Sequence, residues 1–139
     1  MLDVLLVTHA AATWLMVGLS WTVRGVHYPL FGHAAADFGA FHRGHTTRIT
    51  AVLAVPWVVE GATAAILPFV VADADVPAAL VGLGLVGAIA TLTAFGAVPA
   101  HRRLADGFDV ATHRRLLAVD SARVGLWTVR GAIAVMLLV

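Results

Sequence analysis

Long apolar runs separated by short polar segments dominate the pattern of this chain. A helix needs about 20 mainly apolar residues to cross the hydrocarbon core of a bilayer. Four runs reach that length, at about residues 2–23, 49–71, 77–99 and 116–138. With their polar flanks they predict helices over about residues 2–27, 44–71, 77–101 and 110–138, in a single transmembrane domain covering residues 1–139.

Short connections and the distribution of arginine predict how these helices are arranged. Short loops favour antiparallel neighbours, so we expect an all-α, up-down four-helix bundle. Seven arginines lie in residues 24–48 and 101–115, whereas the opposite side has Asp3, Asp73 and Asp75 and no arginine. The positive-inside rule therefore predicts both termini outside the cytoplasm.

Local signals mark some of the helix ends. Tyr28 and Pro29 predict the exit of the first helix, because proline cannot donate a helical hydrogen bond. Asp109 and Thr112 are alternative N-caps for the fourth helix.

Composition supports a membrane protein and narrows the chemistry. Sixty per cent of the residues are hydrophobic and 12% are charged, against about a quarter charged in soluble domains. The absence of cysteine excludes disulfides, zinc-thiolate centres and thiol catalysis. A net charge of +1 without a basic aromatic patch gives no indication of nucleic-acid binding, so the expected partner is the lipid bilayer.

Four ionisable residues interrupt the apolar runs: Glu60, Asp120, Arg123 and Arg130. Each costs about 2.5–3.5 kcal/mol near the bilayer centre, so we expect them to face inward and pair. Glu60, the only glutamate, is predicted to pair with Arg123 or Arg130, and Asp120 with Arg123 one turn along its own helix. Such pairs can be purely structural, fixing the register of the helices.

A functional interpretation adds His9 to these four residues as a candidate catalytic or binding group. His9, Thr13, Met16, Ser20 and His27 are predicted to share one face of the first helix. Together with Glu60, Asp120, Arg123 and Arg130, His9 would bind a small polar head group, relay a proton or act as a general base.

Six of the seven histidines fall at the predicted cytoplasmic end. Imidazole is the commonest transition-metal ligand, so His27, His45, His101 and His113 form a candidate site for iron, copper, zinc or haem. The alternative is that they are ordinary interfacial residues.

Several segments carry a resemblance that covers most of the chain: "VHYPLF", "FHRGHTTRIT", "PWVVEGATA", "VPAHRRLADGFDVATHRRLL" and "RVGLWTVRGAIAV". The sequence resembles a group of small bacterial four-helix membrane proteins and, more loosely, the anthrone-oxygenase-like superfamily. The resemblance implies the bacterial cytoplasmic membrane and an activity on aromatic molecules. It supplies no catalytic residues. Asp120 and Ser121 stand where that bacterial group would have an Asn-Trp pair.

Three functions remain open on the sequence. The first is a membrane oxidoreductase or oxygenase that acts on a small hydrophobic molecule. The second is a structural or accessory subunit of a membrane complex, or a homo-oligomer, because small residues recur four apart at Gly84 and Ala88 and at Gly87 and Thr91. The third is a module that binds or transports a small molecule or protons.

Overall fold

The computed structural model describes residues 1–34 and 37–139, and every element within them is a helix. The first long segment comprises α1 (Leu2–Thr22), the π-helical turn η1 (Val23–His27), α2 (Tyr28–Leu30) and the 3-10 turn η2 (Phe31–His33). The second comprises α3 (Phe38–Ile66) and η3 (Leu67–Phe69). The third comprises η4 (Asp73–Asp75), α4 (Val76–Leu92), the π-helical turn η5 (Thr93–Ala97) and α5 (Val98–Ala105). The fourth is α6 (Val110–Met136).

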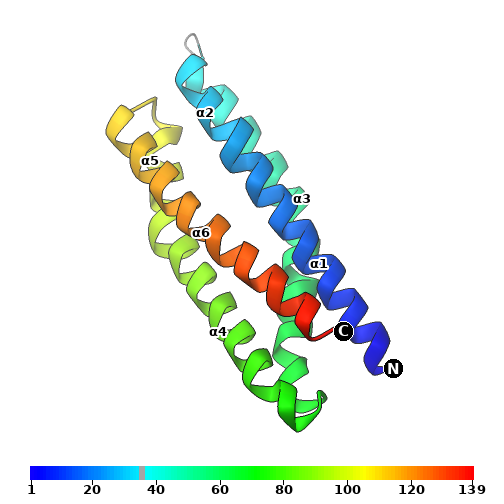
Figure 1. Cartoon of the computed structure of the whole chain (residues 1–139). Coiled ribbons are helices and arrows are strands. Elements are labelled where there is room, and N and C mark those ends of the chain that lie inside the picture. The colour runs from blue at the N-terminus through cyan, green and yellow to red at the C-terminus, as the bar shows by residue number, and fades with distance from the viewer. Residues whose placement is uncertain (35–36) are drawn as a thin grey trace.

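The four long segments lie side by side in an elongated molecule (Figure 1). Helix α1 packs against α3 and α6, and α4 packs against α6 and α3. The two termini lie toward the same end of the molecule (Figure 1). The predicted all-α fold with four long helices is therefore confirmed.

Three of the four segments, Leu2–His33, Phe38–Phe69 and Asp73–Ala105, are long and apolar enough to cross a membrane. Helix α6 is not among these spans, because Asp120, Arg123 and Arg130 interrupt its apolar part, and all three are buried inside the molecule. The exposed positions of α6 between Leu116 and Met136 carry small or apolar side chains and no charge. The outer surface of α6 thus resembles that of its apolar neighbours.

The predicted exit of the first helix at Tyr28 and Pro29 is wrong, because the helical segment continues to His33. The π-helical turn η1 ends two residues before Pro29, and η5 ends two residues before Pro99. A π turn shifts the hydrogen bonding from i→i+4 to i→i+5. This local change precedes both prolines, and the chain remains helical through each of them.

Helix α3 begins six residues earlier than predicted, at Phe38 rather than residue 44. Asp37 caps it, because its carboxylate accepts a hydrogen bond from the Ala40 amide at 3.2 Å. Asp109, one of the two predicted caps of the last helix, accepts from the Thr112 amide at 2.7 Å. Hydrogen bonds from Thr112 lower the pKa of the exposed Asp109 carboxyl below its usual value.

Apolar clusters fill the interior at three levels. One surrounds Phe31 and Leu104, one contains Met16 and Trp127, and one contains Leu67. The segments approach each other closely at Gly96, where an added Cβ would lie 2.8 Å from Val119 Cγ1. Buried polar side chains lie between these apolar clusters and form the candidate site.

Candidate functional site

Asp120 and Arg123 form a buried ion pair one turn apart on α6, as predicted. Arg123 Nη1 donates to Asp120 Oδ1 at 2.9 Å, and the two residues are 8% and 2% exposed. Asp120 Oδ2 and Arg123 Nε are also buried, and neither has a hydrogen-bond partner among the described residues. Buried polar atoms are normally satisfied, so this pair has spare capacity to bind another polar group.

Glu60 pairs with Arg130, which decides between the two arginines that the sequence left open. Arg130 also donates to the carbonyl oxygen of Gly82, so one guanidinium connects α3, α4 and α6. Glu60 is fully buried, and Arg130 lies with its Cζ 5.8 Å from the centre of the Trp127 ring. The position of this ion pair at the junction of three helices gives it a structural role.

His9 lies next to this ion pair rather than next to Asp120. Its Nδ1 is 2.9 Å from Thr63 Oγ1. The Thr63 hydroxyl donates to the carbonyl of Val59 or Glu60, at 2.9 and 3.0 Å, so it accepts from His9 Nδ1–H. His9 thus joins α1 to α3 within one turn of Glu60.

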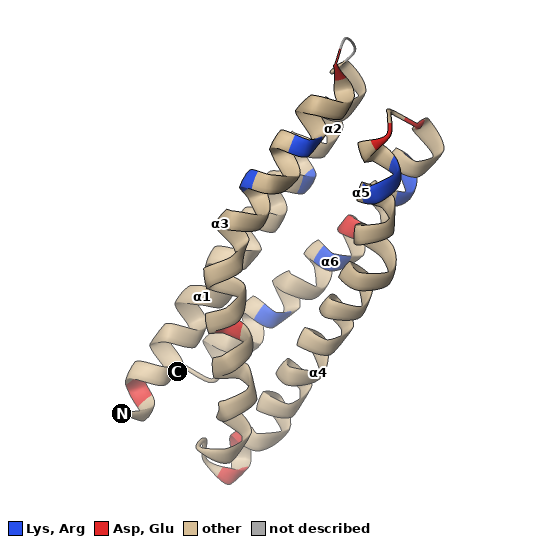
Figure 2. Cartoon of the chain, turned by 180° about the vertical axis from the view of Figure 1, so that it is seen from behind, with Lys and Arg blue, Asp and Glu red and all other residues tan. Residues whose placement is uncertain are grey.

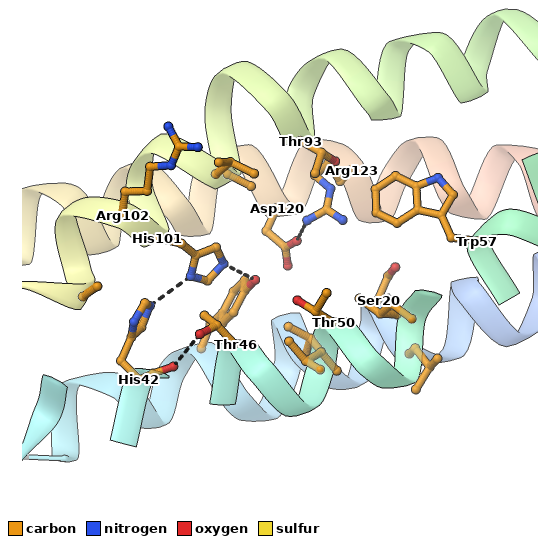
Figure 3. Close-up of a pocket in the computed structure, with 18 residues that line it drawn as sticks. Ser20, His42, Thr46, Thr50, Trp57, Thr93, His101, Arg102, Asp120 and Arg123 are labelled. Atoms are coloured by element: carbon orange, nitrogen blue, oxygen red, sulfur yellow. Dashed lines mark hydrogen bonds and ion pairs between the residues drawn. The ribbon is translucent and has the colours of Figure 1, made fainter. Parts of the chain in front are cut away.

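A cavity of about 360 Å³ lies between residues of α1 and α3 on one side and residues of η5, α5 and α6 on the other (Figure 3). Its apolar wall includes Leu19, Val23, Ile49, Leu53, Ala97 and Val98. Its polar lining consists of Ser20, Tyr28, His42, Thr46, Thr50, Trp57, Thr93, His101, Arg102, Asp120 and Arg123. The predicted set of five candidate residues therefore divides: Asp120 and Arg123 line this cavity, and His9, Glu60 and Arg130 lie outside its lining.

A chain of hydrogen bonds begins at the cavity wall. The Tyr28 hydroxyl is 3.0 Å from His101 Nε2. His101 Nδ1 in turn is 3.0 Å from His42 Nε2 (Figure 3). His42 is 1% exposed, and its Nδ1 has no partner among the described residues. A neutral imidazole donates through one nitrogen and accepts through the other. The two contacts therefore form a continuous hydrogen-bonded route between the Tyr28 oxygen and His42.

The structure gives no support to a metal centre of His27, His45, His101 and His113. Within residues 1–34 and 37–139, no group of three or more His, Asp or Glu side chains is placed to hold a metal ion. His101 belongs to the hydrogen-bond chain with Tyr28 and His42, and His113 Nε2 donates to the Tyr28 carbonyl at 2.7 Å. His27 and His45 face each other with ring centroids 5.4 Å apart.

The predicted polar face of the first helix is correct only in part. His9, Thr13, Met16 and Ser20 are buried, but His27 is exposed. The prediction assumed 100° per residue throughout, whereas η1 contains more residues per turn. The π-helical turn rotates His27 away from the line of His9.

Sequence reasoning missed Tyr28 and His42 as partners of the candidate site. For His42, one feature of the sequence could have indicated a role in the site: it lies one helical turn before His45. For Tyr28, no feature of the sequence could have done so, because its contact with His101 spans 73 residues and depends on how two helices pack.

Comparison of the chain with protein-family models, with curated proteins and with solved structures found no significant match.

Proposed function

We propose that this protein is an integral membrane protein of the bacterial cytoplasmic membrane, an up-down four-helix bundle with both termini extracytoplasmic. The three apolar spans and the uncharged outer face of α6 between Leu116 and Met136 support the insertion of all four segments. Outside the interior, basic residues gather toward the end of the molecule that holds α2 and α5 (Figure 2). This end is cytoplasmic under the positive-inside rule.

Helix lengths give the depth of the cavity. The 32 residues from Phe38 to Phe69 extend about 48 Å at 1.5 Å per residue, whereas the hydrocarbon core is about 30 Å thick. If Phe69 marks the outer boundary, the inner boundary falls near Ile49, about 20 residues earlier. The cavity then crosses the inner boundary, with His42 on the cytoplasmic side and Trp57 within the hydrocarbon layer.

We further propose that the cavity binds a small hydrophobic molecule by a hydroxyl or carbonyl group. The observation that carries this proposal is that buried atoms of Asp120 and Arg123 have no hydrogen-bond partner within the described residues and line a chamber of about 360 Å³ whose surface is mainly apolar. The charges of Asp120 and Arg123 cancel, and Arg102, the other arginine of the lining, is exposed to solvent, so the buried pair favours a neutral ligand over an ion. A pocket of this size lies within the usual range for small-molecule sites.

We also propose that the protein is an oxidoreductase or oxygenase, the enzyme class that the sequence resemblance implies. An aromatic hydroxyl bound near Tyr28 would lose its proton into the chain of His101 and His42. The resulting anion is richer in electrons than the neutral phenol and is oxidised more easily, with dioxygen as the oxidant for an oxygenase. The contribution of these residues is acid–base catalysis.

A matched pair of ligands tests the binding proposal. We expect 1-naphthol to bind the purified protein in mild detergent more tightly than naphthalene, as measured by equilibrium dialysis. Tyr28→Phe removes one oxygen and keeps the ring, so it should weaken naphthol binding by up to about tenfold, the value of one hydrogen bond. Naphthalene binding should be unchanged.

Arg114→Gln is the control, because Arg114 is exposed on α6 and is not part of the cavity lining. This variant should bind naphthol like the unmodified protein. Equal affinity for naphthol and naphthalene would overturn the proposed role of the cavity, and an unaltered preference in Tyr28→Phe would overturn the proposed contact with Tyr28.

A further inference from the structure

A second hollow lies on the surface between the end of the first helical segment and α3. It has a volume of about 400 Å³ and is lined by His27, Ala40, Phe41, Gly44, His45, Arg48, Ile49 and Val52. It shares only Ile49 with the lining of the interior cavity. We call this hollow the lateral groove.

The polar lining of the lateral groove favours an anion. Arg48 supplies a positive charge, His27 and His45 supply ring nitrogens, and no Asp or Glu is among the lining residues. His45 Nε2 is buried without a hydrogen-bond partner in the described part of the chain. Two facing imidazoles and a guanidinium are suited to donate hydrogen bonds to phosphate oxygens.

Gly44 allows Arg48 to lie along the groove. An added Cβ at Gly44 would come 3.0 Å from Arg48 Nη1, so the guanidinium already occupies the space that a side chain would need. The arginine is thus folded back over the preceding turn of α3. A larger residue at position 44 would therefore crowd the Arg48 guanidinium.

The groove also lies at the depth of lipid phosphate groups. The helix-length argument places the inner boundary of the hydrocarbon core near Ile49. Arg48, His45 and His27 then fall in the head-group layer, and Val52 falls beside the first carbons of the acyl chains. Ile49 and Val52 continue the groove into an apolar surface.

From this geometry we infer that the lateral groove binds an anionic phospholipid of the cytoplasmic leaflet. Arg48, His27 and His45 hold the phosphate, and one acyl chain lies over Ile49 and Val52. The apolar part of the groove distinguishes this ligand from a soluble anion, which has no acyl chain to contact Ile49 and Val52. The inference rests on the proposed transmembrane orientation and is independent of what the interior cavity binds.

Native mass spectrometry with added lipid tests this inference. We expect the protein to retain phosphatidylglycerol in preference to phosphatidylcholine, whose ammonium group cancels the phosphate charge. Arg48→Gln should weaken phosphatidylglycerol binding about fivefold, because one arginine near an anionic surface contributes about that factor. Arg43→Gln removes an equal charge from the same helix outside the groove and should have a much smaller effect.

Three results would overturn the inference. The first is equal retention of the two lipids, and the second is equal loss of binding in Arg48→Gln and Arg43→Gln. The third is displacement of the lipid by millimolar inorganic phosphate, which would identify the ligand as a soluble anion. None of these results bears on the naphthol experiment, and flotation of the protein with liposomes checks membrane insertion separately.

Discussion

Replacing Glu60 by glutamine tests whether the ion pair with Arg130 stabilises the bundle. Glutamine has nearly the volume of glutamate, so the change removes the charge without creating a cavity. Glu60 is fully buried and Arg130 is 2% exposed, so the guanidinium cannot reach water in place of its lost partner. The carbonyl of Gly82 would remain as its hydrogen-bond acceptor.

The expected loss is about 3–5 kcal/mol in the free energy of unfolding, the usual result when one member of a buried ion pair is removed. An independent scale agrees, because an unpaired arginine at the bilayer centre costs about 2.5–3.5 kcal/mol. Helical circular dichroism during titration of dodecyl sulfate into detergent micelles would measure the change. Asp73→Asn, at an exposed acid away from the pair, should cost much less.

A double variant distinguishes the loss of the ion pair from the separate effects of changing each residue. Arg130→Met combined with Glu60→Gln removes both charges, so the double variant should be clearly more stable than the sum of the two single losses predicts. The reasoning fails if Glu60→Gln costs less than about 1 kcal/mol, or if the two single losses add.

Three further predictions address packing, capping and orientation. Gly96→Ala should cost about 1–3 kcal/mol by overpacking, because its new Cβ would press on Val119 Cγ1; combining it with Val119→Ala should restore most of the loss in the same unfolding assay. Asp109→Ala should lower the melting temperature at neutral pH, and the difference should vanish in acid. The pKa of Asp109 is lowered in the folded protein, so its contribution is present above the unfolded pKa and is lost as the pH falls through the folded pKa. A reporter enzyme fused to the C-terminus should be active only outside the cytoplasm, and cytoplasmic activity would reverse the proposed orientation.

The ion pairs could be predicted because the sequence shows which charges fall in apolar runs, where an unpaired charge is costly, and how far apart they lie along a helix. Asp120 and Arg123 are one helical turn apart, so their contact needs no knowledge of tertiary structure. Glu60 needed a basic partner, and the apolar runs of the sequence contain two arginines, Arg123 and Arg130. Choosing Arg130 required the rotation of α3 relative to α6, which the sequence pattern does not contain.

The structure does not support the predicted histidine set as a metal site, for the same physical reason. His27, His45, His101 and His113 share an end of the molecule, but a shared depth does not bring side chains onto facing surfaces. The π-helical turn η1 rotated His27, and packing placed His42 beside His101. By contrast, the early start of α3 was visible in the sequence, because Asp37 directly before an apolar residue is a typical N-cap signal.

In the proposed transmembrane arrangement, the burial of all three central charges of α6 has a consequence for how the chain enters the membrane during synthesis. Inserted alone, α6 would expose Asp120, Arg123 and Arg130 to lipid, at a cost of about 2.5–3.5 kcal/mol for each charge that stays unpaired. Asp120 and Arg123 carry their pairing within the helix, but Arg130 depends on Glu60, which is translated 70 residues earlier in α3. We therefore expect α6 to be the last segment to leave the insertion machinery, and to leave it only when α3 is already in place to receive it.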